Sequence, residues 1–62
     1  MGEKIKKRRE ELKMSQDELA EKAGISRQTV SAIETGKYEN VMIGTLKAIA
    51  RALGCELDFF LP

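Results

Sequence analysis

Residues 27–34, with the sequence RQTVSAIE, carry side chains that suit the edges of nucleic-acid bases. Arg27 can donate two hydrogen bonds to the O6 and N7 atoms of guanine, and Gln28 can bridge the N6 and N7 atoms of adenine. Ser31 and Ala32 follow about one helical turn later, so they share the outward side of the same helix. The alanine methyl can contact the methyl group of thymine. These four side chains could contact base edges together, and they form the candidate base-reading set.

No arrangement of residues in the chain points to catalysis. The sequence contains no histidine and a single cysteine, Cys55, which has no obvious base beside it. A single cysteine excludes an intramolecular disulfide, and the lack of histidine makes a zinc site implausible. Cys55 is expected to be a small apolar packing residue. The sequence therefore predicts a protein that is not an enzyme and needs no cofactor or metal.

The segment before the base-reading residues has the signals of a short helix. Ser15 and Glu18 match a capping box, in which the serine oxygen and the glutamate side chain each bond a free backbone amide. Met14 and Leu19 flank this box at the spacing of a hydrophobic staple. Gly24 can adopt the left-handed conformation that often follows the last turn of a helix. A helix is therefore predicted over about 16–23.

The same signals recur immediately afterwards and predict a second helix over about 27–35. Ser26 is the predicted N-cap, and Ile25 and Val30 are the second staple, although Thr29 replaces the acidic half of the box. Only residues 24–26 separate the two helices, and so short a link fixes their angle, as in a helix-turn-helix. From these signals alone, the pair could equally be part of an ordinary helical bundle.

The whole stretch SQDELAEKAGISRQTVSAIETGK, residues 15–37, resembles the helix-turn-helix of the phage repressor and Cro type, also called the xenobiotic-response-element type. The pattern xLSQxELAxKxGxSRQTxSxIExGK is matched almost throughout, with Met14 where leucine is commoner. The resemblance covers about residues 5–53. It implies an all-α, compact DNA-binding domain of four to five helices, similar to lambda repressor. One domain, 1–62, is predicted, with its other helices over about 2–13 and 43–53.

The resemblance also implies how the domain works. Helix 27–35 would enter the major groove of double-stranded DNA, with its N-terminal residues at the base edges, and the following loop would lie along one strand. Gln16, Thr29 and Lys37 stand at positions that hold phosphates in relatives. Tyr38 and Asn40 could donate to the DNA backbone, and Ser15 is a further predicted phosphate contact. A homodimer would place two such helices about 34 Å apart on a palindrome. By occluding a promoter, it would repress transcription.

The first and last predicted helices should present apolar faces to the core. Ile5 and Leu12 lie seven residues apart, hence on one face of helix 2–13. The basic run around them, KIKKRR, is interpreted as part of a structural helix whose charges attract phosphates at long range. The predicted inner stripe of helix 43–53 consists of Ile43, Leu46, Ile49, Ala50 and Leu53.

Arg9 and Glu34 fall on the inner faces of their helices, where an unpaired charge is very unfavourable. Arg9 lies four residues after Ile5, and Glu34 lies four after Val30. Relatives commonly pair an arginine with a glutamate at the matching positions. We therefore predict an Arg9–Glu34 salt bridge between the first and third helices; two separately solvated surface charges are the alternative.

The tail, CELDFFLP at 55–62, departs from the pattern of relatives that end in a fifth helix. Its period-two alternation places Leu57, Phe59 and Leu61 on one side, and with the aromatic residues it favours a β-strand. Such a strand would pair with that of a second copy, so these three residues are the predicted dimerisation set. The alternative is a short helix or loop that packs Leu57 and Phe60 onto the core.

Composition bounds the remaining possibilities. The net charge is only +1, from 11 Lys and Arg against 10 Asp and Glu, so DNA binding requires a basic face rather than a basic total. No apolar run approaches the ~20 residues of a membrane span, and the N-terminus lacks the features of a signal peptide. A cytoplasmic protein without a membrane partner is expected.

A second function of another class is compatible with the sequence. The chain could be an antitoxin-like interaction module that neutralises a partner protein such as a toxin, with DNA binding secondary. Exposure of Phe59 and Phe60 in the tail would favour this alternative.

Overall fold

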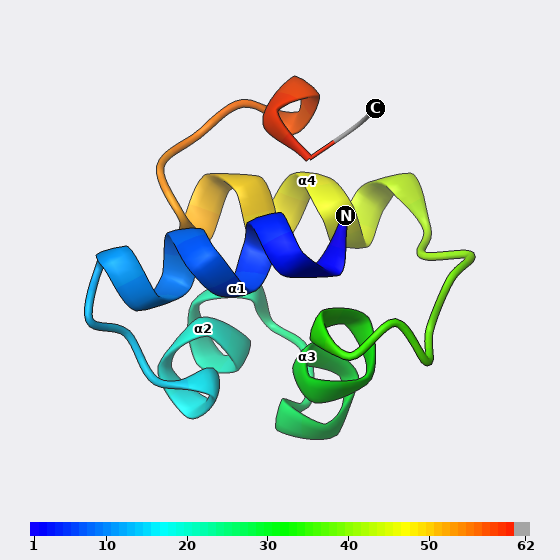
Figure 1. The fold of residues 1–62 in the computed structure, drawn as a ribbon, viewed down its shortest axis with the longest axis horizontal. Helices are drawn as coiled ribbons and strands as arrows, with labels where there is room; N and C mark the ends of the chain where they lie inside the picture. Colours follow the sequence, from blue (N-terminus) through cyan, green and yellow to red (C-terminus); the bar gives the residue numbers. More distant parts are fainter. Residues whose placement is uncertain (61–62) are drawn as a thin grey trace.

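The structure, a computed structural model of the chain, describes residues 1–60, and all the regular secondary structure in this part is helical (Figure 1). The four α-helices are α1 (Gly2–Glu11), α2 (Gln16–Ala23), α3 (Arg27–Glu34) and α4 (Ile43–Ala52), followed by the short 3-10 helix η1 (Leu57–Phe59). In Figure 1, α2 and α3 lie along the lower side of the molecule and η1 lies at the upper side. The predicted all-α fold is confirmed.

Caps fix the boundaries of the two central helices. The backbone amide of Glu18 donates to Ser15 Oγ over 3.0 Å, and the amide of Ser15 donates to Glu18 Oε1 over 3.0 Å, so the capping box is complete. Gly24 ends α2 with a φ of 72°, a conformation that is easily adopted only by glycine. Ser26 then caps α3 by accepting a hydrogen bond from the amide of Thr29 over 3.1 Å. The turn between α2 and α3 is therefore set by local chemistry.

One core joins all the elements. Its fully or almost fully buried apolar residues are Ile5, Leu19, Ala20, Val30, Ile33, Leu46, Ile49, Ala50, Leu53 and Phe60. Met14, Ile25 and Cys55 are partly buried against this core, in keeping with their predicted packing roles. Burial raises the pKa of the Cys55 thiol, and the nearby charge of Arg8 acts in the opposite direction.

A close approach between backbones joins the beginning of α1 to the end of α3. A Cβ atom on Gly2 would collide with the carbonyl oxygen of Ile33 and would lie 2.9 Å from that of Glu34. Only glycine therefore fits at this position without moving one of the two helices.

Two apolar residues assigned to inner faces are in fact exposed. Leu12 is 41% exposed because α1 ends at Glu11 and Lys13, with a φ of 55°, turns the chain away. Ile43 is 54% exposed because it is the first residue of α4 and its side chain points away from the core. Val41, two residues earlier, is partly buried against the core instead.

The strand predicted for the tail is wrong for the described residues 55–60. Leu57–Phe59 form a 3-10 turn, and the aromatic ring that enters the core is that of Phe60, which is 1% exposed. Phe59 is 50% exposed, and its ring meets that of Phe60 edge-on at a centroid distance of 5.6 Å. Burying Phe60 removes more apolar surface from water than an unpaired strand would, so the chain turns here. The third residue of the dimerisation set, Leu61, and Pro62 lie outside the described residues.

No helix within residues 1–60 has both the length and the apolar character needed to cross a membrane.

Candidate nucleic-acid interface

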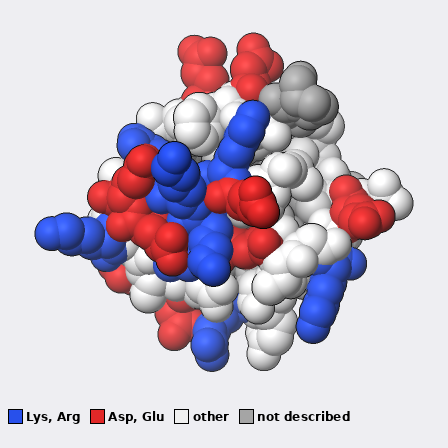
Figure 2. Space-filling model, viewed as in Figure 1, with Lys and Arg blue, Asp and Glu red and all other residues white. Residues whose placement is uncertain are grey.

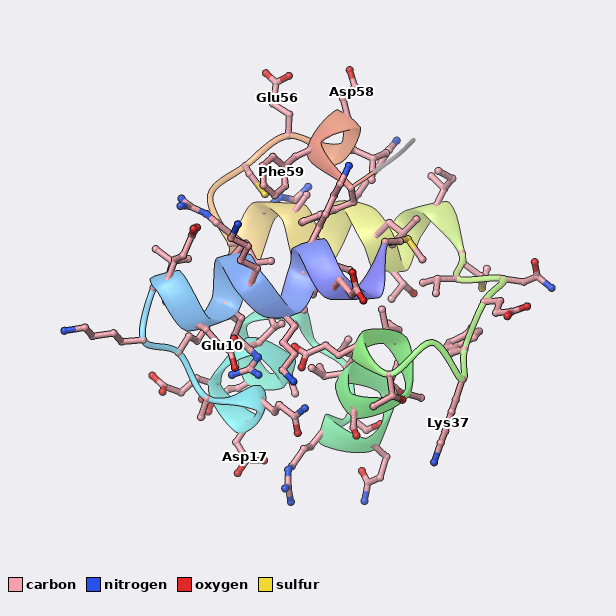
Figure 3. All side chains as sticks on the ribbon, in the orientation of Figure 1. Glu10, Asp17, Lys37, Glu56, Asp58 and Phe59 are labelled. Atoms are coloured by element: carbon pink, nitrogen blue, oxygen red, sulfur yellow. The ribbon has the colours of Figure 1, made fainter. Side chains whose placement is uncertain are left out.

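The outward side of α3 borders an open cavity of about 280 Å³. Its lining residues come from α2, α3 and the following loop, and they are Gln16, Arg27, Gln28, Ser31, Ala32, Thr35 and Lys37. The cavity thus brings together all four predicted base-reading residues and two of the predicted phosphate contacts. In Figure 3, Lys37 and Asp17 project outward on the side of the molecule that carries α3.

The two sides of α3 have separate roles. Val30, Ile33 and Glu34 are buried against the other helices, and their spacing of three and four residues gives a single inner face. Arg27 and Gln28 are exposed at the start of the helix, next to the Ser26 cap. The sequence of α3 therefore fixes the helix through one face and leaves the other free for a ligand.

Arg27 has one acidic neighbour. Its Nε atom lies 3.6 Å from Oδ1 of Asp17, and both side chains are largely exposed, at 65% and 76%. An ion pair so open to solvent stabilises a protein very little. Arg27 can therefore leave Asp17 for a stronger bidentate acceptor.

The predicted Arg9–Glu34 ion pair is present and joins α1 to the end of α3. Arg9 Nε donates to Glu34 Oε2 over 2.7 Å and Nη2 donates to Oε1 over 3.1 Å, so the contact is bidentate. The Glu34 side chain is 1% exposed. Arg9 Nη1 also donates to the carbonyl oxygen of Met14 over 2.7 Å. Hydrogen bonding to Glu34 raises the pKa of Arg9, although burial acts in the opposite direction.

The ion pair extends to the interface through Gln16. Gln16 Nε2 donates to Glu34 Oε1 over 3.1 Å, which holds the first residue of α2 against the last residue of α3. The sequence indicated the ion pair but not this third member. A buried network with every polar group bonded is rigid, so it fixes where Gln16 lies relative to α3.

The other predicted phosphate contacts lie outside the cavity. Ser15 Oγ is occupied as the cap of α2, and Thr29 Oγ1 shares a 2.8 Å hydrogen bond with Ser26 Oγ. Tyr38 and Asn40 are exposed in the loop between α3 and α4, where the amide of Tyr38 donates to the carbonyl oxygen of Ala32 over 3.1 Å.

Comparison with known proteins identifies the family. The family model described as "Helix-turn-helix", of the Cro/C1 type, matches residues 5–60. The chain belongs to the Cro/C1-type helix-turn-helix family. This family consists of DNA-binding transcriptional regulators and not of enzymes.

Relatives of this helix-turn-helix protein are found in archaea and in phages. It is 48% identical over 52 residues to an "Uncharacterized HTH-type transcriptional regulator" of Methanothermobacter thermautotrophicus, covering 84% of this chain and 74% of the relative. It is 44% identical over 58 residues to the "Immunity repressor protein" of Bacillus phage phi105. That match covers 94% of this chain but only 40% of the phage protein.

A solved structure shares the fold over nearly the whole chain. It is that of SinR, described as the master regulator for biofilm formation, in complex with DNA. The TM-score is 0.93 and the sequence identity is 34%, over 98% of this chain and 100% of the other. The chain is thus a repressor-like helix-turn-helix regulator in fold and in family.

Thr35 is a residue of this interface that sequence reasoning missed. It lines the cavity, and its hydroxyl donates to the carbonyl oxygen of Ser31 over 2.9 Å at the end of α3. This bond leaves the hydroxyl oxygen free to accept a hydrogen bond. Its position four residues after Ser31, on the same face, was the signal that could have found it.

Proposed function

We propose that the protein binds a specific sequence of double-stranded DNA and represses transcription, with α3 lying in the major groove. The observation that carries this proposal is the outward face of α3, on which Arg27, Gln28, Ser31 and Ala32 border one open cavity and none enters the core. A helix with hydrogen-bonding groups at its exposed N-terminal end suits the docking of helix-turn-helix proteins.

Each residue of the interface has a proposed role. Arg27 bridges a guanine and Gln28 an adenine, and each good pair discriminates against a wrong base by about 1–3 kcal/mol. Ser31 and Ala32 contact neighbouring base edges, the alanine through a thymine methyl group. Phosphates are held by Gln16 and Lys37, which also line the cavity, with Ser15, Thr29, Tyr38 and Asn40 as further contacts. Such contacts fix the register of the protein on DNA but carry no sequence information.

A homodimer completes the proposal. One domain of this size contacts only a few base pairs, whereas two copies present two α3 helices about 34 Å apart, one turn of DNA. The preferred operator is then a palindrome. Residues 57–59 of the tail form a 3-10 turn, so the proposed dimer does not rely on pairing residues 55–60 as a sheet.

The test is selection of bound DNA from a random duplex library by the purified protein at two salt concentrations. We expect a palindrome with half-sites about one turn apart. Arg27→Ala and Gln28→Ala should each relax the selected sequence at one position per half-site, whereas Lys47→Ala on α4 should not. A library that stays random with the wild-type protein would contradict the proposal.

The antitoxin-like alternative is favoured by one observation, the 50% exposure of Phe59. Aromatic residues, phenylalanine included, are enriched in protein–protein interfaces. In that case Phe59→Ala would abolish binding of the partner and spare DNA binding, while Arg27→Ala would do the reverse.

A further inference from the structure

A second groove lies between α1 and the tail. It encloses about 560 Å³ and is lined by Lys4, Lys7, Arg8, Glu11, Cys55 and Phe59. The four α1 residues are spaced three and four apart, so they form one stripe along the helix. Figure 1 shows η1 and α3 on opposite sides of the molecule, so this groove is separate from the proposed DNA interface.

The tail side of the groove is apolar. Phe59 leaves half of its surface exposed, and Cys55 is partly buried beside it. Figure 3 shows the Phe59 ring between η1 and α1, while Glu56 and Asp58 point outward from the tail. A ring that leaves half of its surface exposed beside a concave space can still bury apolar area against a partner.

The α1 side of the groove is cationic. Its lining there includes three basic side chains and one carboxylate, that of Glu11. Arg8 already donates through Nε to the carbonyl oxygen of Leu53 over 3.2 Å. Arg8 Nη1 also lies 3.8 Å from Glu11 Oε1, so the negative charge of Glu11 is partly balanced by Arg8. Neither Lys4 nor Lys7 forms an ion pair with any carboxylate in residues 1–60. Figure 2 shows basic side chains interleaved with acidic ones over α1.

We propose that this groove between α1 and the tail binds an acidic amphipathic segment of a partner protein. An apolar side chain of the segment covers Phe59 and Cys55, and its carboxylates meet Lys4 and Lys7. Charge complementarity selects this occupant, because an acidic segment gains from both unpaired lysines whereas a basic or neutral one does not. The partner approaches from the side away from α3, so it can be recruited while the protein is bound to DNA. This inference does not depend on which DNA sequence α3 recognises.

The test uses two synthetic peptides of about 16 residues with Leu and Phe at i, i+3, i+4 and i+7 spacing. In one peptide the remaining positions are Glu, and in its control they are Gln. Fluorescence anisotropy with the labelled peptides gives affinities, and amide chemical shifts of the ¹⁵N-labelled protein give the contact surface. We expect the Glu peptide to bind at least ~10-fold more tightly than the Gln peptide and to shift the amides of residues 4–11 and 55–59.

Matched variants locate the binding energy. Phe59→Ala and the double variant Lys4→Gln/Lys7→Gln should each weaken Glu-peptide binding by about 10-fold, as expected for an aromatic anchor and its flanking charges. The charge-matched double variant Lys22→Gln/Lys47→Gln, outside the groove, should bind the peptide as the wild type does. Circular dichroism checks that each variant is folded. The peptide-bound wild type should still bind duplex DNA.

Three results would overturn the proposal. One is no binding of the Glu peptide at about 1 mM. Another is equal binding of the two peptides, which would mean that the lysines contribute nothing. The third is self-association that Phe59→Ala abolishes, measured by sedimentation without peptide, because the groove would then serve a second copy. Each of these is independent of the DNA selection experiment, so failure of one proposal is distinguishable from failure of the other.

Discussion

At the scale of single residues, one buried carboxylate serves both folding and the proposed DNA contact. Glu34 accepts hydrogen bonds from two nitrogen atoms of Arg9 and from Gln16. Their spacing from Ile5 and Val30 predicted that the two charges lie in the interior, and the family resemblance supported pairing them. Gln16 was predicted only as a phosphate contact, because periodicity does not indicate which polar group a surface side chain reaches.

Replacing Glu34 should destabilise the fold severely. Glu34→Ala leaves Arg9 buried without its partner, which typically costs about 3–5 kcal/mol. In a domain this small, that loss lowers the melting temperature by more than ~10 °C. Thermal unfolding followed by circular dichroism measures it. Glu39→Ala, in the exposed loop before α4, is the control and should melt with the wild type.

If Glu34→Ala melts within a degree or two of the wild type, the ion pair contributes nothing to stability. Arg9→Met/Glu34→Leu offers a further check. Replacing both partners of a buried pair by apolar residues is often neutral or stabilising, so the double variant should recover much of the lost stability.

At the scale of elements, the caps were predictable, whereas the segment before α4 and the tail were not. Ser15, Ser26 and Gly24 act through neighbours in sequence, so their roles follow from local patterns. The path of the chain before α4 depends on tertiary packing, which exposes Ile43 and half-buries Val41. In the tail, period-two and period-three patterns overlap. The structure follows the i, i+3 pattern: Phe60 is buried in the core and Leu57 packs against it.

The adjacent phenylalanines of the tail should differ sharply on substitution. Phe60→Ala removes a ring that is 1% exposed, and such changes typically cost about 3–5 kcal/mol. Phe59→Ala removes a half-exposed ring and should cost well under half as much. Urea unfolding of the two variants measures the difference in free energy. Equal losses would show that the tail does not dock through Phe60.

Replacement by alanine should have opposite effects at Gly2, which lies in the contact between α1 and α3, and at Gly44 on α4. Gly2→Ala forces α1 away from the Ile33 carbonyl and should destabilise the protein by about 1–3 kcal/mol. Gly44→Ala, in the first turn of α4, meets open space and should stabilise it by up to ~1 kcal/mol through helix propensity. Thermal unfolding of both variants is the measurement. Stabilisation by Gly2→Ala would mean that the close approach is not maintained in solution.

At the scale of the whole molecule, a net charge of +1 limits how strongly DNA attracts the protein without regard to sequence. Two sets of basic side chains lie at separate grooves, with Lys37 beside α3 and the Lys4, Lys7 and Arg8 stripe against the tail. The sequence predicted that the α1 lysines attract phosphates, but their placement follows only from the three-dimensional fold. Binding should therefore depend on a small number of phosphate contacts.

The salt dependence of DNA binding measures those contacts. If Lys37 neutralises a phosphate, Lys37→Gln should weaken binding uniformly across sequences and reduce the slope of log K against log salt by about 1. Lys47→Gln on α4 should leave the slope unchanged. The affinities come from titrations of one operator duplex at several salt concentrations. An unchanged slope for Lys37→Gln would remove this residue from the interface.

The interleaving of buried and exposed positions on α3 has a consequence for evolution and design. Positions 27, 28, 31 and 32 lie outside the fully buried core, while positions 30, 33 and 34 hold the helix in place. Substitutions at these four outward positions can therefore accumulate without disturbing the fold. If these four side chains read DNA as proposed, two copies of the gene could come to recognise different operators through changes at these positions. Under the same proposal, a protein engineer could alter the recognised DNA sequence by mutating these four positions.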